Sequence, residues 1–208
     1  MAEAQPFAGR RWVRFGCAMI VLAVAIASQP ACRVAQPVTA RAPAELEAEE
    51  IRLAGALREL GEKVDPLESR RVARVIVRTV EDARISGGID GRPIQRNLAV
   101  AVGWHDWGLC WQWAELLGRR LHREGLKSLA LDWGCAHAGS HLREHNALVI
   151  TAKGQPFEEG LVVDPWRRGG RLVWIRVADD RYPWKHEPWS EIRWESPVAG
   201  GLPDRGTP

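Results

Sequence analysis

The sequence has little net charge, and it lacks an apolar run long enough to cross a membrane comfortably. Its formal charge is +3 over 208 residues, and most of that charge lies in the first 31 residues, where three arginines face one glutamate. A body of nearly balanced charge gives no electrostatic case for binding nucleic acid. The apolar stretch at 15–28 is shorter than the roughly 20 residues that a transmembrane helix needs.

Cysteine is scarce as well, with four in the whole chain. Cys17 and Cys32 belong to the N-terminal region, so only Cys110 and Cys135 remain in the body. An oxidising compartment would permit a disulfide between these two. Two cysteines are a thin disulfide framework, however, which favours the view that one of them is kept free for chemistry.

The N-terminus has the pattern of an export signal. Three arginines within residues 10–14 precede the apolar run, and residues 1–31 are therefore predicted to be a signal peptide. Two processing outcomes compete: cleavage after Ala27 gives a soluble periplasmic or secreted protein, and lipidation of Cys32 gives a membrane-anchored lipoprotein. An uncleaved short anchor is a third possibility. Residues 32–44, rich in Ala, Pro and Arg, are predicted to form a tether.

The remainder, residues 45–208, is predicted to be one α+β domain. Hydrophobic residues make up 46% of the sequence and charged residues 26%, which is ordinary for a globular protein. Helical periodicity predicts three helices, and short apolar runs with tight turns predict an antiparallel sheet on which the helices pack. The expected helices are 45–60, 66–84 and 109–123, with a loop at 87–97; the expected strands are 127–133, 146–151, 160–164 and 171–177, followed by a tail that wraps the surface.

Cys110 is the first candidate for chemistry. Gly108 is expected to cap the third helix, which places Cys110 in its first turn, where unpaired N–H groups and the helix dipole favour a thiolate. Helical spacing puts the thiol on the same face as the apolar residues Trp113 and Leu117, so it should point toward the sheet. A lone cysteine in a helix is more often a small buried hydrophobe.

Two strand ends supply possible partners for the thiol. His145 opens one predicted strand, and Asp164 closes the next, where Pro165 prevents its continuation. If these strands are neighbours, the carboxylate would lie beside the imidazole. The imidazole would then take the thiol proton, while the carboxylate fixes the tautomer and stabilises the imidazolium. Taken singly, His145 is more often a satisfied polar group, and Asp164 before proline is more often a turn former.

Three stretches together resemble the signature of a known superfamily. GLCWQWA at 108–114, EHNALVI at 144–150 and LVVDPW at 161–166 look like the three motifs of the transglutaminase-like enzymes, over a catalytic core of about 98–177. The resemblance implies a papain-like core in which Cys110 is the nucleophile, His145 the general base and acid, and Asp164 the orienting carboxylate. It also implies hydrolysis or transfer of amide bonds in a peptide, protein or cell-wall substrate, with no cofactor and no metal.

Tryptophan is abundant near these motifs: ten of the eleven tryptophans lie beyond residue 100. Most of these rings should serve the core. Trp104, Trp111 and Trp166 are the candidates for a substrate groove or an oxyanion site. The backbone N–H of Cys110 is one expected oxyanion donor, and the second is left open between the Trp104 indole, His105 and Asn97.

Other interpretations compete with the thiol enzyme. Cys135, His137, His141 and His145 would share a face on a helix and could hold zinc, although the glycines at 134 and 139 indicate a loop instead. A non-catalytic envelope binding module would use a groove lined by Trp104, Trp107, Trp111 and Trp166. The arginines at 167, 168 and 171 read as a solvated hairpin, or else as a carboxylate-selecting cluster.

Mass spectrometry of the mature protein tests the predicted export signal. An acylated Cys32 as the first residue would establish a lipoprotein, and a start at Ser28 would establish cleavage after Ala27. A protein that keeps Met1 in the cell-envelope fraction would contradict both outcomes.

Overall fold

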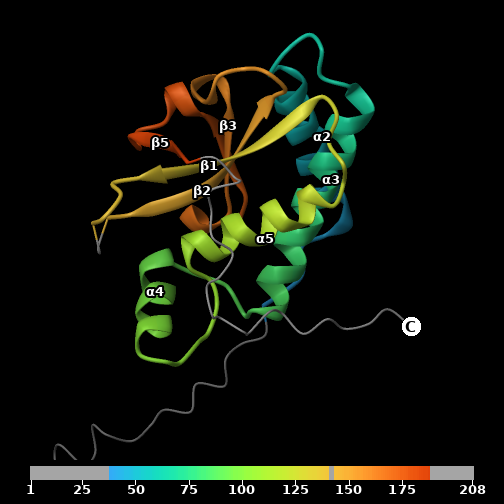
Figure 1. The fold of residues 1–208 in the computed structure, drawn as a ribbon. Coiled ribbons are helices and arrows are strands. Elements are labelled where there is room, and N and C mark those ends of the chain that lie inside the picture. The colour runs from blue at the N-terminus through green and yellow to red at the C-terminus, as the bar shows by residue number, and fades with distance from the viewer. Residues whose placement is uncertain (1–37, 141–142, 188–208) are drawn as a thin grey trace, which may run out of the picture. The chain divides into compact units, whose positions relative to one another are not determined.

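The structure, a computed structural model, describes residues 38–140 and 143–187. These residues form four α-helices and a five-stranded antiparallel sheet, so the predicted α+β class is confirmed (Figure 1). The helices are α2 (Pro43–Arg58), α3 (Pro66–Ser86), α4 (Pro93–Ala101) and α5 (Cys110–His122). The strands are β1 (Leu129–Ala136), β2 (His145–Ala152), β3 (Leu161–Asp164), β4 (Val173–Arg176) and β5 (Trp184–Glu187), with short 3₁₀ turns η1 (Phe157–Glu159), η2 (Trp166–Arg168) and η3 (Val177–Asp179).

The sheet is a meander to which the end of the described chain adds one edge. Its order is β4-β3-β2-β1-β5, and every neighbouring pair is antiparallel. Four consecutive strands pair in chain order, as sequential strands commonly do. β5 then returns to the free side of β1, which brings residues 184–187 next to residues 133–136. The sheet therefore joins the candidate histidine strand to the last described residues through β1.

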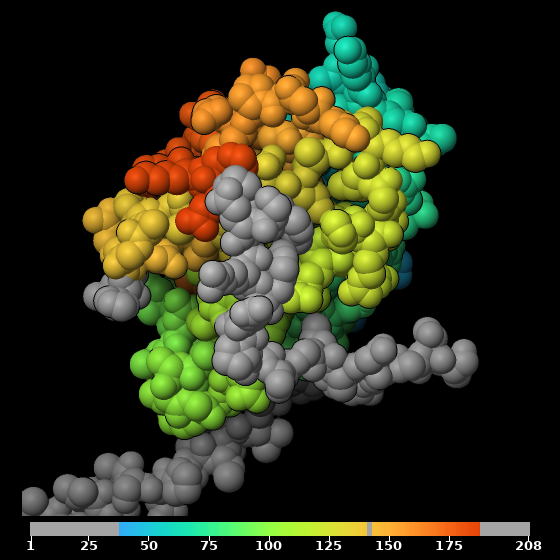
Figure 2. All heavy atoms as spheres, viewed as in Figure 1, coloured from blue at the N-terminus to red at the C-terminus, as the bar shows by residue number. Residues whose placement is uncertain are grey.

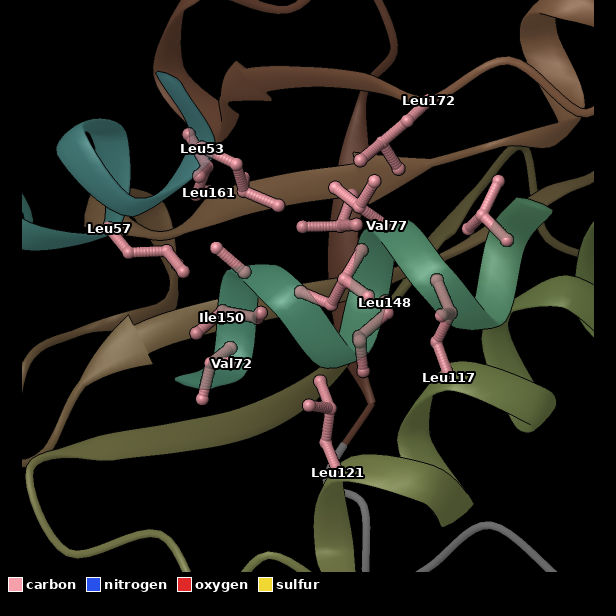
Figure 3. Packing of buried hydrophobic residues seen from close by; sticks show 14 of the residues in the cluster. Leu53, Leu57, Val72, Val77, Leu117, Leu121, Leu148, Ile150, Leu161 and Leu172 are labelled. Atoms are coloured by element: carbon pink, nitrogen blue, oxygen red, sulfur yellow. The ribbon is translucent and has the colours of Figure 1, made fainter. Parts of the chain in front are cut away.

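The main hydrophobic core lies between the helices and one face of the sheet. Figure 3 shows side chains of α2, α3 and α5 meeting those of β2 and β3. α3 is amphipathic: one face is an apolar stripe that is buried in the core, and the opposite face is charged. The buried cluster includes Leu53, Leu57, Val72, Ile76, Val77, Val80, Trp113, Leu117, Leu121, Leu148, Ile150, Leu161 and Val163. A second, smaller cluster of Ala147, Val149, Phe157 and Val162 fills the other face of the sheet.

Two elements lie where the sequence predicts none. α4 begins inside the predicted loop 87–97, and β5 lies in the predicted surface tail. None of the residues of α4 is buried, and the helix is only nine residues long, although Ile94, Leu98 and Ala101 lie at helical spacing. Ile94 is 77% exposed and Leu98 is 63% exposed, and Figure 2 shows the atoms of α4 standing out at the surface. β5 is held by backbone pairing with β1, and its residues Trp184-Lys185-His186-Glu187 are mostly exposed.

Ion pairs hold the start of the described chain against α3. Arg41 donates to Glu81 and to Glu49 at 2.8 Å each, and Arg84 donates to Glu81 and to the carbonyl of Thr39. α2 begins at Pro43, two residues earlier than expected. The predicted signal peptide, Cys32 and most of the predicted tether lie outside the described residues. Among the helices of the described ranges, none is long and apolar enough to cross a membrane.

Glu68, in the first turn of α3, fixes the beginning of β1. Its buried carboxylate accepts hydrogen bonds from the backbone N–H groups of Lys127, Ser128 and Leu129, at 3.0 to 3.3 Å. The helix itself begins correctly because Asp65 caps it, accepting from the N–H of Leu67 at 2.6 Å. One carboxylate therefore satisfies three backbone donors that no strand partner reaches, and it ties the helix layer to the sheet.

Replacing Glu68 by Ala should lower the free energy of unfolding by about 3 kcal/mol, because buried backbone donors lose a charged acceptor. Glu68→Gln keeps one acceptor oxygen and should cost less. Urea denaturation measures both, with Glu62→Ala as the control, since Glu62 is exposed on the neighbouring turn. If Glu68→Ala loses no more stability than the control, Glu68 does not stabilise the contact between α3 and the start of β1.

Candidate active site

Cys110 is the first residue of α5 and so lies in its first turn, as the sequence predicts, but the cap differs from the expected one. The N-cap is Leu109, and the side chain of Gln112 accepts from the N–H groups of Gly108 and Leu109 at 2.8 and 2.9 Å. The glycine is needed for another reason: its φ is +118°, and a Cβ there would lie 2.9 Å from Cγ of Arg96. The side-chain oxygen of Gln112 accepts from Gly108 and Leu109 and not from Cys110. The backbone N–H of Cys110 therefore has no acceptor among the described residues.

His145 and Asp164 meet because of the register between β2 and β3. Leu148 faces Val163 across this pair, and continuing the register places Asp164 beside Ala147, on the same side of the sheet as His145. Nε2 of His145 lies 2.6 Å from Oδ2 of Asp164. Each side chain is only 2% exposed. A short, buried contact of this kind orients the imidazole and determines which ring nitrogen remains for other chemistry.

The thiol of Cys110 is close enough to influence the same imidazole. Burial alone would lower the pKa of His145, but hydrogen bonds and charges from Asp164 and Cys110 outweigh burial and raise the pKa to about 9. Nδ1 of His145 is buried and makes no well-aligned hydrogen bond with any residue that the structure describes. Both observations fit a thiol that faces Nδ1 without full alignment, as is common in unliganded sites.

The raised pKa of His145 has a definite consequence for stability. Folding favours the protonated ring, since the folded-state pKa of about 9 exceeds the ordinary value of 6.5. This contribution is fully present below pH 6.5 and is lost as the pH rises from 6.5 through 9. At neutral pH the folded protein therefore holds His145 largely as an imidazolium, in contact with a carboxylate and near a thiol.

Three aromatic rings surround the imidazole. The ring centroids of Trp166, Tyr182 and Trp184 lie 4.7, 4.9 and 5.4 Å from that of His145. The sequence singles out Trp166 but neither Tyr182 nor Trp184, because both lie in the segment expected to wrap the surface. The one feature of the sequence that could have pointed to Tyr182 and Trp184 is the high aromatic content of that segment. Together the rings keep water away from one side of the imidazole, which strengthens its electrostatic contacts.

No known protein family, curated protein or solved structure matches this chain. The geometry itself supports one kind of chemistry. A thiol at a helix N-terminus, an imidazole with one nitrogen directed away from its carboxylate, and a free backbone N–H beside the sulfur are the parts needed for nucleophilic attack on a carbonyl carbon.

The other predicted groove and oxyanion residues are dispersed. Trp104 is 79% exposed, and Trp111 packs against the buried cluster of Ala114, Trp133 and Cys135. The amide oxygen of Asn97 accepts from the Trp166 indole at 3.0 Å, which fixes Trp166 beside His145 and connects α4 to η2. Among the described residues, the N–H of Cys110 is therefore the clearest candidate for an oxyanion donor, and the second donor is not identified.

The described residues of the alternative zinc site, Cys135, His137 and His145, each have other partners and do not come together. Cys135 is buried in β1, which continues to Ala136 where a loop is predicted, and Nε2 of His145 is held by Asp164. His137 instead lies 3.4 Å from a guanidinium nitrogen of Arg143. Among the residues that the structure describes, no group of three His, Cys, Asp or Glu side chains could hold a metal; His141 lies outside them.

Cys110 and Cys135 are both free thiols, so the disulfide that their number permits is not formed. Arg167 also departs from expectation. It is neither a solvated hairpin residue nor a free carboxylate receptor, because its side chain is 13% exposed and pairs with Asp164 and Asp180. Arg168 and Arg171 are exposed, as a solvated hairpin predicts.

Alkylation by iodoacetamide at pH 7, followed by peptide mass spectrometry, should label Cys110 at least about 100-fold faster than Cys135. Burial, with the nearby charges of Glu187 and Glu144, raises the pKa of Cys135 to about 11 and keeps that thiol protonated. His145→Ala should slow labelling of Cys110, because the proposed proton acceptor of the thiol is removed. Equal labelling of the two cysteines, or a rate unaffected by His145→Ala, would contradict this assignment.

Proposed function

We propose that this chain is a thiol enzyme of transglutaminase-like type that acts outside the cytoplasm on amide or peptide bonds. The observation that supports the proposal best is the buried 2.6 Å contact of His145 with Asp164, in a site where Cys110 raises the pKa of the same imidazole. The resemblance of the three sequence stretches around these residues adds a papain-like arrangement, which remains part of the proposal.

In the proposed reaction, the Cys110 thiolate attacks the substrate carbonyl carbon and forms a tetrahedral intermediate. The negative charge that develops on the carbonyl oxygen is stabilised by the N–H of Cys110. The C–N bond breaks as His145 gives its proton to the departing amine, which leaves a thioester on Cys110 and a neutral imidazole. Asp164 keeps the ring oriented through both steps and stabilises its protonated form.

The second half-reaction decides whether the enzyme hydrolyses or transfers. Neutral His145 takes a proton from water or from an amine, whose oxygen or nitrogen attacks the thioester carbon. The thiolate leaves, and the imidazolium forms again, so Cys110 and His145 return to the charges with which the proposed reaction began. Water as acceptor gives a protease or amidase, and an amine gives a transamidase; the three protein groups have the same roles in both.

The deep burial of His145 and Asp164 favours a functional role for this ion pair. His145 is among the largest fully buried side chains, and Asp164 is 2% exposed. Buried charged groups destabilise a protein unless they are paired, so a structural role alone would be served as well by apolar residues. A buried imidazole with a raised pKa and a thiol beside it is instead the usual arrangement of a functional site.

Acylation by p-nitrophenyl acetate tests the proposal without knowledge of the natural substrate. The parent protein should release a burst of p-nitrophenol and gain the mass of one acetyl group on Cys110. Cys110→Ala should lose both signals, His145→Ala should be nearly as severe, and Asp164→Asn should cost roughly 10²- to 10⁴-fold. Combined substitutions should be far from additive, because the groups act as one unit.

Cys135→Ala is the matched control, since it removes the other body thiol and should keep the burst. Adding a primary amine such as glycinamide then separates the two reactions, because a transamidase forms the acetylated amine faster than free acetate. A folded parent protein that forms no acyl-enzyme would end the proposal and favour the binding module. Acylation that persists in Cys110→Ala would place the nucleophile elsewhere.

A further inference from the structure

Arg167 lies between two carboxylates beside the candidate site. Its Nε donates to Oδ2 of Asp164 at 2.7 Å, and its two terminal nitrogens donate to the two oxygens of Asp180, one of them at 3.0 Å. All three side chains are largely buried, with exposed fractions of 13%, 2% and 1% for Arg167, Asp164 and Asp180. The guanidinium therefore has fixed partners on both sides, which a planar fork of donors suits well.

Asp180 is itself held in place by residues that lead into β5 and begin it. Its Oδ2 accepts from the Trp184 indole at 2.9 Å, and its Oδ1 accepts from the backbone N–H of Tyr182 at 3.4 Å. The Arg167 guanidinium also lies 4.6 Å from the centre of the Tyr182 ring. Two of the three rings beside His145, together with the second acid that holds Arg167, thus belong to one short segment, 180–184.

One oxygen of Asp164 serves two cationic donors. Oδ2 accepts from Nε2 of His145 at 2.6 Å and from Nε of Arg167 at 2.7 Å. A positive charge that close to the carboxylate weakens its attraction for the imidazolium, since both compete for the same negative charge. Asp180 offsets this effect because it supplies a second negative charge to Arg167 on the side away from His145.

We propose that Arg167 and Asp180 are a positioning pair: Arg167 fixes the orientation of the Asp164 carboxylate, and Asp180 neutralises Arg167 so that His145 keeps its proton. The inference rests on the proposed function for its catalytic meaning, because Asp164 and His145 are the proposed triad members. Arg167 and Asp180 act through Asp164 and touch no reacting atom.

The charged and titratable groups around His145 come from four places in the fold. Cys110 reaches it from α5, Asp164 from β3 and Arg167 from η2, while Asp180 and Tyr182 come from the segment before β5. Among the described residues, Arg167 is the cation in direct contact with the acid that binds the imidazole. A change in its charge, or in that of its counter-ion Asp180, must therefore be felt at His145.

The pKa of His145, measured by NMR titration of its ring nitrogens, tests the pair because the two single substitutions should shift it in opposite directions. Asp180→Asn leaves the charge of Arg167 uncompensated and should lower the pKa of His145 by about one pH unit. Arg167→Gln removes the competing cation and should raise it by a similar amount. The double substitution removes both charges and should return the pKa close to the parental value.

A merely structural role predicts a different pattern. Loosening the site would weaken the contact of His145 with Asp164 in both single variants, so the pKa would fall in both. That result, or an unchanged pKa in both, would overturn the inference. Arg168→Gln and Asp179→Asn are the matched controls, since each changes the same charge at an exposed neighbouring position. Neither control should move the pKa of His145.

Two further readouts keep the test decisive. If Asp180→Asn does not fold, the double substitution and Arg167→Lys remain; the lysine keeps the charge but reaches only one carboxylate, so the pKa should stay close to the parental value while acetylation slows. Arg167→Gln should lower the rate of acetylation by p-nitrophenyl acetate about tenfold without changing KM, because Arg167 touches no substrate. Opposite pKa shifts in a protein that never acetylates would sustain this inference and refute the proposed function.

Discussion

The register of β2 against β3 is the constraint on which the candidate site depends. Leu148 and Val163 face each other in the main core, and this pairing leaves His145 and Asp164 on the opposite side of the sheet, within one hydrogen bond. Because side chains alternate along a strand, a slip of one residue would turn Asp164 toward the helices and separate it from His145. The apolar core therefore fixes the position of two polar groups that do not belong to it.

Most of the fold could be predicted because its strongest signals are local. α3 combines an Asp-Pro start with a long apolar stripe, and each strand of the meander has a short apolar run that ends at a turn. The candidate residues were visible for the same reason: each sits at the end of an element with a clear boundary, before Pro165 for Asp164 and after Gly108 for Cys110. Boundaries that are marked in the sequence give predictable positions.

The remaining features depend on contacts between distant residues, which no local pattern announces. Gln112 takes over the capping that Gly108 was expected to provide, because its side chain reaches back to two backbone donors. Arg167 is next to Trp166 in a stretch that reads as a solvated hairpin, yet its partner Asp180 lies 13 residues away. β5 carries no alternating pattern, because pairing with β1 rather than burial determines its conformation.

The return of β5 to β1 has a consequence for the order in which the protein is made. Residues 180–184, which supply two of the rings beside His145 and one acid that holds Arg167, are made about 70 residues after Cys110, several seconds later at ordinary rates of synthesis. Until the ribosome has produced β5, the sheet lacks its last edge, and the imidazole lacks two of its three aromatic neighbours. The surroundings that would activate the thiol are thus completed after the thiol itself has been made, so a partly synthesised chain carries the proposed nucleophile without them.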